Sequence, residues 1–354
     1  MWLRRGREIV LSRGGQETVG LQCLAATGDY LRALSRQDRS AAVEVASRAA
    51  DARASVADVI EQMLAPAQAE VGVRAQRDDW SIAEEHAATA ITEVVLGVLA
   101  LRLPASAPRP ASICVTTPAG EWHGLAARMV AESLRARGWD AIFLGTDIPD
   151  DHLRRFISRV GPAVVLLSCT MPALLPQLAR SVDAVTEAGI PTIVGGFGCG
   201  SDARRARAVG ASAWAPDPLA AHLLLSRWID EGAAPPPARR ADLPDDYLDL
   251  VGRRSPLVDR LATRAEAYLT PAGVPRQPTV RQIGAQLVDT LAASLFVDDP
   301  LVLHDHVDWL VEMLDARHVP PDAVRALLDA LHDALADLPR AERFTATIRG
   351  PRST

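Results

Sequence analysis

Apolar residues recur at spacings of three and four in four segments between residues 20 and 103, which is the pattern of amphipathic helices. Ser81, followed three residues later by Glu84, predicts a capping box at the start of the fourth. The links between the segments are short, so a helical bundle is predicted within residues 1–103. The segments read GLQCLAATGDYLRALSRQ, RSAAVEVASRAADAR, SVADVIEQMLAPAQAEVGVRAQ and SIAEEHAATAITEVVLGVLALRL.

Residues 112–230 alternate between short apolar runs and helix-like segments. The runs are continuously apolar, which is typical of parallel strands covered on both faces. Five strands and five helices in alternation predict a doubly wound, flavodoxin-like (Rossmann-like) domain. The predicted strands are SICVTT, DAIFLG, AVVLLSC, PTIVGG and ASAWA.

A proline-rich stretch, AAPPPARRADLPDD, separates this domain from a helical region at residues 247–345. Asp299 before Pro300 and Asp322 after Pro321 predict two helix starts in that region. The fold class is therefore multidomain, α and α/β, with an all-helical C-terminal domain.

Composition narrows the function classes. The 354 residues carry a net charge of −6, whereas a dedicated nucleic-acid binder is usually basic. The four cysteines form no CxxC pair, which disfavours a zinc site and favours reduced, buried thiols. We find no signal peptide and no apolar run long enough to span a membrane, so a cytoplasmic protein without membrane contact is expected.

One loop carries candidate chemistry. The first predicted strand of the α/β domain stops at Pro118, and Glu121, Trp122 and His123 follow. Open α/β sheets bind ligands at the carboxyl ends of their strands. From position alone, His123 is a base, a metal ligand or a solvated loop residue.

Small and hydroxylated residues end two further strands. Ser168 and Thr170 close the third, and Gly195 and Gly196 follow the fourth. Paired glycines let a ligand approach the backbone, so these ends predict a slot for a ligand tail. No GxGxxG follows the first strand, which disfavours a dinucleotide.

The loop GEWHGLA resembles the Glu/Asp-x-His-x-x-Gly signature of cobalamin-binding domains in methionine synthase, carbon-skeleton mutases and CarH-type light-sensing repressors. The resemblance implies that His123 displaces the dimethylbenzimidazole base and binds cobalt from below, with Glu121 orienting it. Trp122 lies in the same loop and is expected at the cofactor. Ala126 replaces the signature's last glycine.

The same resemblance implies that the strand-end residues line the slot for the displaced nucleotide tail. These residues are Ser168, Thr170, Gly195 and Gly196.

The segment WSIAEEHAATAITE resembles the Glu-His signature in the bundle of the light-sensing repressors. It implies that Glu85 and His86 cover the upper face of adenosylcobalamin, and that His86 binds cobalt after light has removed the adenosyl group. The repressors' capping tryptophan aligns with Ala75, so Trp80 either contacts the upper ligand or only anchors the bundle core.

The C-terminal region has several histidines, and its segment LHDHVDWLVEMLDARHV predicts that His306, Trp309 and Met313 share a helix face, with His304 on another side. In architecture and length the chain resembles photocobilins, which join a cobalamin sensor to a globin-like domain that binds biliverdin. The implied noncovalent bilin contacts are Tyr268, Arg276, Arg281, His304 and His306. A plain dimerisation bundle is the alternative.

These patterns and resemblances predict a light sensor that binds adenosylcobalamin base-off and His-on, possesses no enzymatic activity of its own, and forms a homodimer. Its downstream partner is not identified by the sequence, and direct DNA binding is not expected. The alternative is a corrinoid carrier that serves a methyltransferase, with the C-terminal domain as an interaction module.

Overall fold

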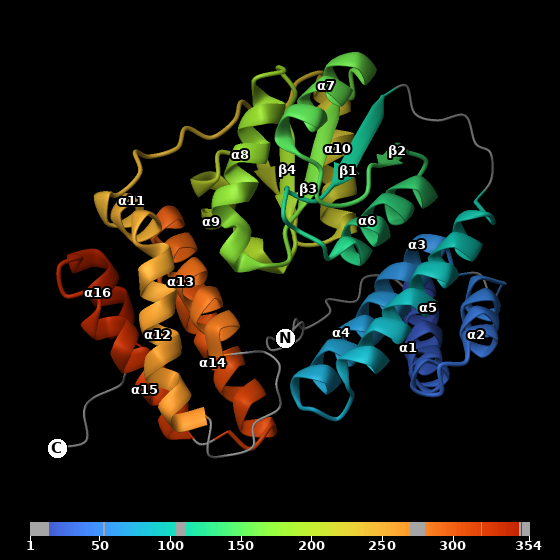
Figure 1. Cartoon of the computed structure of the whole chain (residues 1–354). Coiled ribbons are helices and arrows are strands. Elements are labelled where there is room, and N and C mark those ends of the chain that lie inside the picture. The colour runs from blue at the N-terminus through green and yellow to red at the C-terminus, as the bar shows by residue number, and fades with distance from the viewer. Residues whose placement is uncertain are drawn as a thin grey trace.

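A five-stranded parallel sheet forms the middle part of the chain in sequence, and the two helical parts both lie below it in Figure 1. The computed structural model describes residues 14–51, 54–103, 111–269, 280–319, 321–346 and 348. The strand order is β2-β1-β3-β4-β5, which is the flavodoxin-like order with its switch point between β1 and β3. The predicted doubly wound domain is confirmed. Its strands are β1 (Ser112–Thr116), β2 (Asp140–Phe143), β3 (Val164–Ser168), β4 (Thr192–Gly195) and β5 (Ala213–Trp214).

Helices cover both faces of the sheet because alternate strand side chains point to opposite sides. Val115 and Leu166 pack against α6 and α10, whereas Val165 and Leu167 pack against α7, α8 and α9. Both faces are therefore dry, as the continuously apolar runs predict. The helices are α6 (Gly124–Ala136), α7 (Asp150–Val160), α8 (Leu175–Thr186), α9 (Arg204–Ala208) and α10 (Pro218–Glu231); two 3₁₀ turns, η2 (Pro172–Leu174) and η3 (Phe197–Cys199), follow β3 and β4.

The N-terminal bundle has the four predicted helical segments. The third is continuous but contains a π-helical turn, whose last hydrogen bond runs from Ala65 N–H to the Ile60 carbonyl. Pro66 has no N–H to continue the α-helical ladder, which accounts for the wider turn at this place. Ser81 and Glu84 form the predicted capping box. The elements are α1 (Gly14–Ser35), α2 (Arg39–Asp51), α3 (Val56–Val59), η1 (Ile60–Leu64), α4 (Ala65–Gln76) and α5 (Ile82–Ala100).

The C-terminal part is all-helical in its described residues. The first predicted helix, from Tyr247 to Leu269, is in fact two helices that meet at Arg253. The second starts at Arg254, so Pro256 falls in its first turn, where a missing N–H costs nothing. The predicted starts at Pro300 and Pro321 are confirmed. The helices are α11 (Asp245–Gly252), α12 (Arg254–Leu269), α13 (Val280–Val297), α14 (Leu301–Ala316), α15 (Pro321–Asp333) and α16 (Pro339–Ala346).

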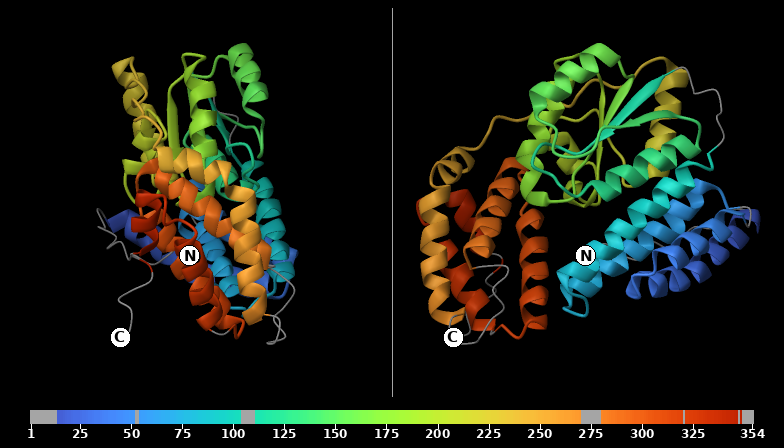
Figure 2. Two further views of the ribbon diagram at one scale, coloured as in Figure 1. Left: turned by 60° about the vertical axis from the view of Figure 1, so that its left-hand side comes forward. Right: turned by 45° about the vertical axis from the view of Figure 1, so that its right-hand side comes forward.

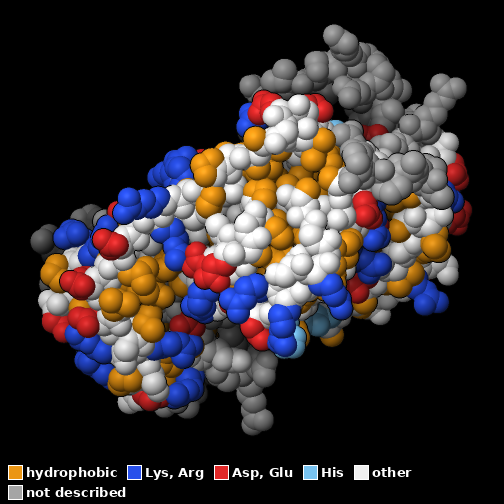
Figure 3. All heavy atoms as spheres, turned by 90° about the horizontal axis from the view of Figure 1, so that it is seen from above, with side chains coloured by type: hydrophobic (Ala, Val, Ile, Leu, Met, Phe, Trp, Pro, Cys, Tyr) orange, Lys and Arg blue, Asp and Glu red, His pale blue; other side chains and the backbone are white. Residues whose placement is uncertain are grey.

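The two helical parts lie on the same side of the sheet domain, and they touch each other as well (Figures 1 and 2). Arg317, after α14, donates to the carbonyls of Ala75 and Gln76 at the end of α4, each at 3.1 Å. Acidic and basic side chains are interspersed over the face seen from above (Figure 3). Within the described ranges, no helix has the length and apolarity needed to cross a membrane.

Candidate cobalamin site

His123 is the residue that precedes α6, and its ring is bound to Glu121. Nδ1 of His123 lies 2.5 Å from Oε1 of Glu121, which also accepts the His123 backbone N–H at 3.1 Å. The turn before them is fixed by Gly120, whose φ is +83° and whose N–H bonds Asp147. Thr117 donates to the Glu121 carbonyl at 2.8 Å. The loop thus presents the imidazole in one orientation.

Glu121 also joins the loop after β1 to the loop after β3. Its second oxygen accepts the backbone N–H groups of Thr170 and Met171, at 2.9 and 2.8 Å. These two loops flank the switch point of the sheet, where doubly wound folds bind ligands. Burial raises the pKa of Glu121, but its hydrogen bonds to His123 and Met171 outweigh that effect and the pKa is lowered. Glu121 is therefore a buried carboxylate.

The His123 ring fits the role of a metal ligand. The hydrogen bond that His123 makes to Glu121 raises the pKa of His123, burial lowers it, and the charges of Glu121 and Glu85 raise it further. Because Nδ1 is bound to the carboxylate, Nε2 is the nitrogen left for a metal, as in carboxylate–histidine–metal triads. The side chain remains 59% exposed, so a cofactor can reach it.

The predicted tail-slot residues converge at the ends of β3 and β4. Ser168 pairs in register with Gly195. The hydroxyl of Thr170 is buried and has no hydrogen-bond partner among the described residues. Buried polar atoms are rarely left unpaired, so this hydroxyl suits a polar ligand group between the two strands. The His123 imidazole and the Thr170 hydroxyl therefore fit a corrinoid, the first as a ligand to its metal and the second as a partner for its tail.

The glycines of the predicted slot have a packing reason of their own. A Cβ on Gly195 would lie 2.5 Å from the Ala215 carbonyl oxygen, and one on Gly196 would lie 2.5 Å from that of Cys169. Gly196 also has a φ of +93°. The glycines are thus required by close packing of the protein's own backbone, and their predicted role in letting a ligand approach the backbone stays a prediction.

Glu85 of the bundle's Glu-His pair lies within electrostatic range of His123. Glu85 lies in the first turn of α5, and its charge raises the pKa of His123. His86 contacts Glu85 at 3.3 Å and its side chain is 74% exposed. Glu85 and His123, which belong to different domains, thus interact electrostatically.

Trp80 and Trp122 differ in their surroundings. Trp80 packs against the bundle core, with the Arg74 guanidinium 5.3 Å from its ring centre. This packing supports the role of a core anchor, and contact of Trp80 with an upper ligand stays a prediction. Trp122 is one of the most exposed large side chains of the described residues, next to His123.

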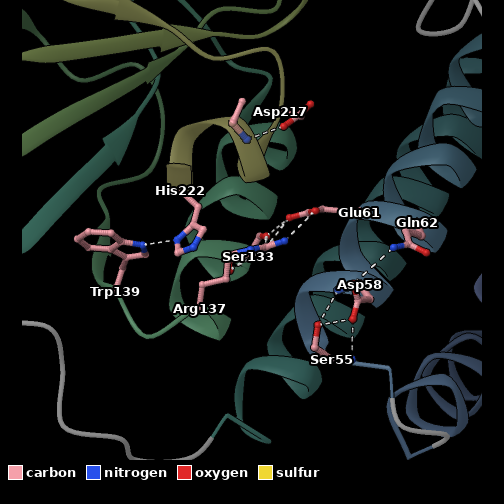
Figure 4. A network of polar contacts seen from close by, with 10 residues as sticks. Ser55, Asp58, Glu61, Gln62, Ser133, Arg137, Trp139, Asp217 and His222 are labelled. Carbon is pink, nitrogen blue, oxygen red and sulfur yellow. Dashed lines mark hydrogen bonds and ion pairs between the residues drawn. The ribbon is translucent and has the colours of Figure 1, made fainter. Parts of the chain in front are cut away.

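A polar cluster fastens α6 to the bundle (Figure 4). Arg137 binds both oxygens of Glu61, at 2.7 and 3.0 Å, and Ser133 joins the pair. Leu125 and Met129 of α6 pack into the bundle core. Since α6 starts just after His123, these contacts hold the imidazole beside the bundle.

Two residues of this site escaped sequence reasoning. A Cβ on Gly124 would lie 2.5 Å from the Thr146 side chain, so any larger residue at the start of this helix would displace Thr146. Thr117 accepts the Asp147 N–H at 3.2 Å as well as donating to the Glu121 carbonyl. A hydroxyl at a strand end was the only signal for it.

In the C-terminal part, His306 and Trp309 stack on one another, with ring centres 5.7 Å apart and an angle of 23°. Met313 is buried beyond them in the C-terminal core, whereas His304 is only partly buried. Nε2 of His306 is buried without a hydrogen-bond partner in the part of the chain described. Burial lowers the pKa of His306 to about 4, so the ring is neutral near pH 7.

Of the other predicted bilin contacts, His304 lies on the same helix as His306, whereas Arg281 lies away from it. Arg281 is at the first turn of α13, ion-paired with Asp259, at the far end of the α13–α14 hairpin from His306. Arg276 and the side chain of Tyr268 lie outside the described residues.

Two family models match the chain. Residues 111–223 match a B12 binding domain, and residues 28–100 match a second B12 binding domain model. Together they cover the bundle and the sheet domain, and neither reaches the C-terminal helices. A search of curated proteins finds no match.

Solved structures of corrinoid proteins are similar to this chain. The monomethylamine corrinoid protein of Methanosarcina barkeri aligns with a TM-score of 0.50 and 17% identity over 56% of this chain and 95% of its own. A cobalamin-binding protein of Desulfitobacterium hafniense aligns at 0.33 with 21% identity, over 58% and 98%. The methanol:cobalamin methyltransferase complex of Methanosarcina barkeri aligns at 0.33 with 16% identity, over 66% and 96%.

The sheet, the Glu121–His123 pair and the two family matches define a corrinoid-binding α/β domain with a helical bundle. The chain is a cobalamin-binding protein that carries both B12-binding domains, followed by a further all-helical part.

Proposed function

We propose that this protein is a light sensor that binds adenosylcobalamin base-off, with His123 below cobalt and the Glu85–His86 pair above. The observation that carries the proposal is the packing of α6 on the bundle: Leu125 and Met129, which follow His123, lie against the bundle core. This brings the imidazole that the resemblance assigns to cobalt beside the bundle helices, and the charge of Glu85 in the first turn of α5 reaches it. When bound, adenosylcobalamin would supply a cobalt–carbon bond that visible light cleaves.

The residues of the chain have separate tasks in this proposal. Glu121 orients the His123 ring and stays ionised. His86 is exposed on α5. It would be able to bind cobalt on the upper face of the corrinoid after the adenosyl group has left. The bundle moves because its two positions interact differently with the cofactor.

Illumination tests this function. The adenosylcobalamin complex, prepared in the dark and without oxygen, should change its visible spectrum irreversibly under green light. His86→Ala should form a different photoproduct, and His152→Ala, at an exposed histidine of α7, should behave as the unaltered protein. A spectrum that light does not change would rule out the sensor. Size-exclusion chromatography of dark and illuminated samples tests the homodimer.

A corrinoid carrier for a methyltransferase is the second candidate. The fold shared with the monomethylamine corrinoid protein supports it, and so does the exposure of His86. A carrier should bind methylcobalamin and give up its methyl group to a thiol acceptor in the dark when a methyltransferase is added. Dark stability with rapid photolysis would favour the sensor.

A bilin in the C-terminal part is also a proposal. The buried, unpartnered Nε2 of His306 and its stack on Trp309 support a site for a flat ligand. Titration with biliverdin should give a red-shifted, protein-bound absorption that His306→Leu abolishes. If the biliverdin spectrum does not change, the bilin proposal fails and the interaction module is the interpretation that is left for the C-terminal part.

A further inference from the structure

Arg205 of α9 is buried between the sheet domain and the C-terminal part. Its Nε donates to Oδ2 of Asp299 at 2.8 Å, and both side chains are only 7% exposed. Asp299 belongs to the turn between α13 and α14, where its other oxygen accepts the Leu301 N–H. Asp305 adds a second carboxylate, 3.6 Å from Nη2. The guanidinium therefore ties the two domains together.

The same guanidinium holds the loop that follows β4. Nη1 of Arg205 donates to the Gly198 carbonyl at 3.3 Å. A Cβ on Gly198 would lie 3.1 Å from the Cys169 carbonyl, and one on Gly200 would lie 3.2 Å from Arg205 itself. The loop is thus fixed between Cys169 on one side and Arg205 on the other.

Apolar packing surrounds this ion pair. Val297 and Val302 of the C-terminal helices share a core with Cys169 and Cys199 of the sheet domain. Helix α13 also packs along η2, the turn that follows Thr170. The loops after β3 and β4, which form the predicted tail slot, therefore rest on the α13–α14 hairpin.

We propose that Arg205 is a positioning residue that makes the tail slot depend on the docked C-terminal part. With the hairpin docked, the loop after β4 is held in place, and the chain favours corrinoids that carry a nucleotide tail over those that lack one. Coupling between two binding events is reciprocal, so a bound tail in turn strengthens docking of the C-terminal helices. This inference rests on the base-off placement proposed above.

The test compares hydroxocobalamin with cobinamide, a corrinoid without the nucleotide tail. Arg205→Met and Asp299→Asn should each weaken hydroxocobalamin binding by about tenfold and leave cobinamide binding unchanged. Arg204→Gln is the matched control, because its partner Asp202 is an exposed neighbour in the same segment; both affinities should stay as they are.

Hydrogen exchange gives a readout that needs no variant. In the unaltered protein, hydroxocobalamin should slow exchange around Asp299 at the α13–α14 turn, and cobinamide should not. If the unaltered protein binds the two corrinoids equally, the base-off placement fails and the inference falls with it. If the unaltered protein prefers hydroxocobalamin and both variants show the same preference over cobinamide, the role of Arg205 is overturned and the base-off placement stands.

Discussion

Glu121 and His123 form a short contact, 2.5 Å from Oε1 to Nδ1, inside a loop whose carboxylate is otherwise fully buried. The second oxygen of Glu121 is bound by the N–H groups of Thr170 and Met171. One carboxylate thus fixes the tautomer of the imidazole and joins the two loops at the switch point of the sheet. It is the structural centre of the candidate site.

Glu121→Gln should weaken cobalamin binding by about 10- to 100-fold, because partners that orient a metal-binding histidine contribute that much to metal affinity. The amide retains one acceptor for the Thr170 and Met171 N–H groups, so folding should persist. Titration of hydroxocobalamin followed by absorbance measures the effect. An unchanged affinity would show that the carboxylate does not act through His123.

Glu61→Gln should lower the stability of the bundle against urea by about 2 kcal/mol, since hydrogen bonds to charged groups contribute about that much. The pair with Arg137 is bidentate and mostly buried. Glu187→Gln is the control, because its pair with Arg154 is exposed and should contribute less than about 1 kcal/mol. Equal losses in the two variants would argue against Arg137–Glu61 as the fastening between α6 and the bundle.

Gly196→Ala should destabilise the protein more than Gly189→Ala. Both positions have a positive φ, which costs an alanine on the order of 1–3 kcal/mol. Only at Gly196 does the added methyl also meet a backbone carbonyl, that of Cys169, whereas Gly189 has open space. Thermal unfolding of the two apo variants compares them directly, and similar melting temperatures would contradict the close packing of the loop.

The C-terminal part should lose stability on acidification. The His306 pKa is about 4 when folded and near 6.5 when unfolded, so the unfolded chain binds the proton more readily. The stabilisation is complete above about pH 6.5 and is lost as the pH falls to about 4, by about 3 kcal/mol at most. His306→Leu should reduce this pH dependence of hydrogen exchange along α14. The same steep loss in the variant would exclude His306 as its cause.

Periodicity was sufficient for the overall fold. The continuously apolar runs predicted a parallel sheet, and the capping signals at Ser81 and Pro300 marked true helix starts. The periodicity of apolar residues did not predict the local effects of two prolines. Pro66 is accompanied by a π-helical turn directly before α4, and Pro256 lies where a predicted helix is divided in two. Neither effect changes the spacing of the apolar residues.

The sequence predicted which residue types form the candidate site, but not how their side chains contact one another. The spacing of Glu121 and His123 indicated the pair, but not that Glu121 reaches Thr170, because backbone N–H groups leave no trace in sequence. Gly124 and Arg205 were missed for a related reason. Each is explained by a contact with a segment distant in sequence or across a domain boundary.

The most direct test of the central claim is electron paramagnetic resonance of the bound cobalt(II) corrinoid in protein whose histidines carry nitrogen-15. If Nε2 of His123 binds cobalt from below, the three-line nitrogen splitting seen with ordinary histidine becomes two-line in the labelled protein, and His123→Ala loses the labelled signal. A three-line splitting that persists in the labelled protein would mean that dimethylbenzimidazole still binds cobalt, and would contradict the account.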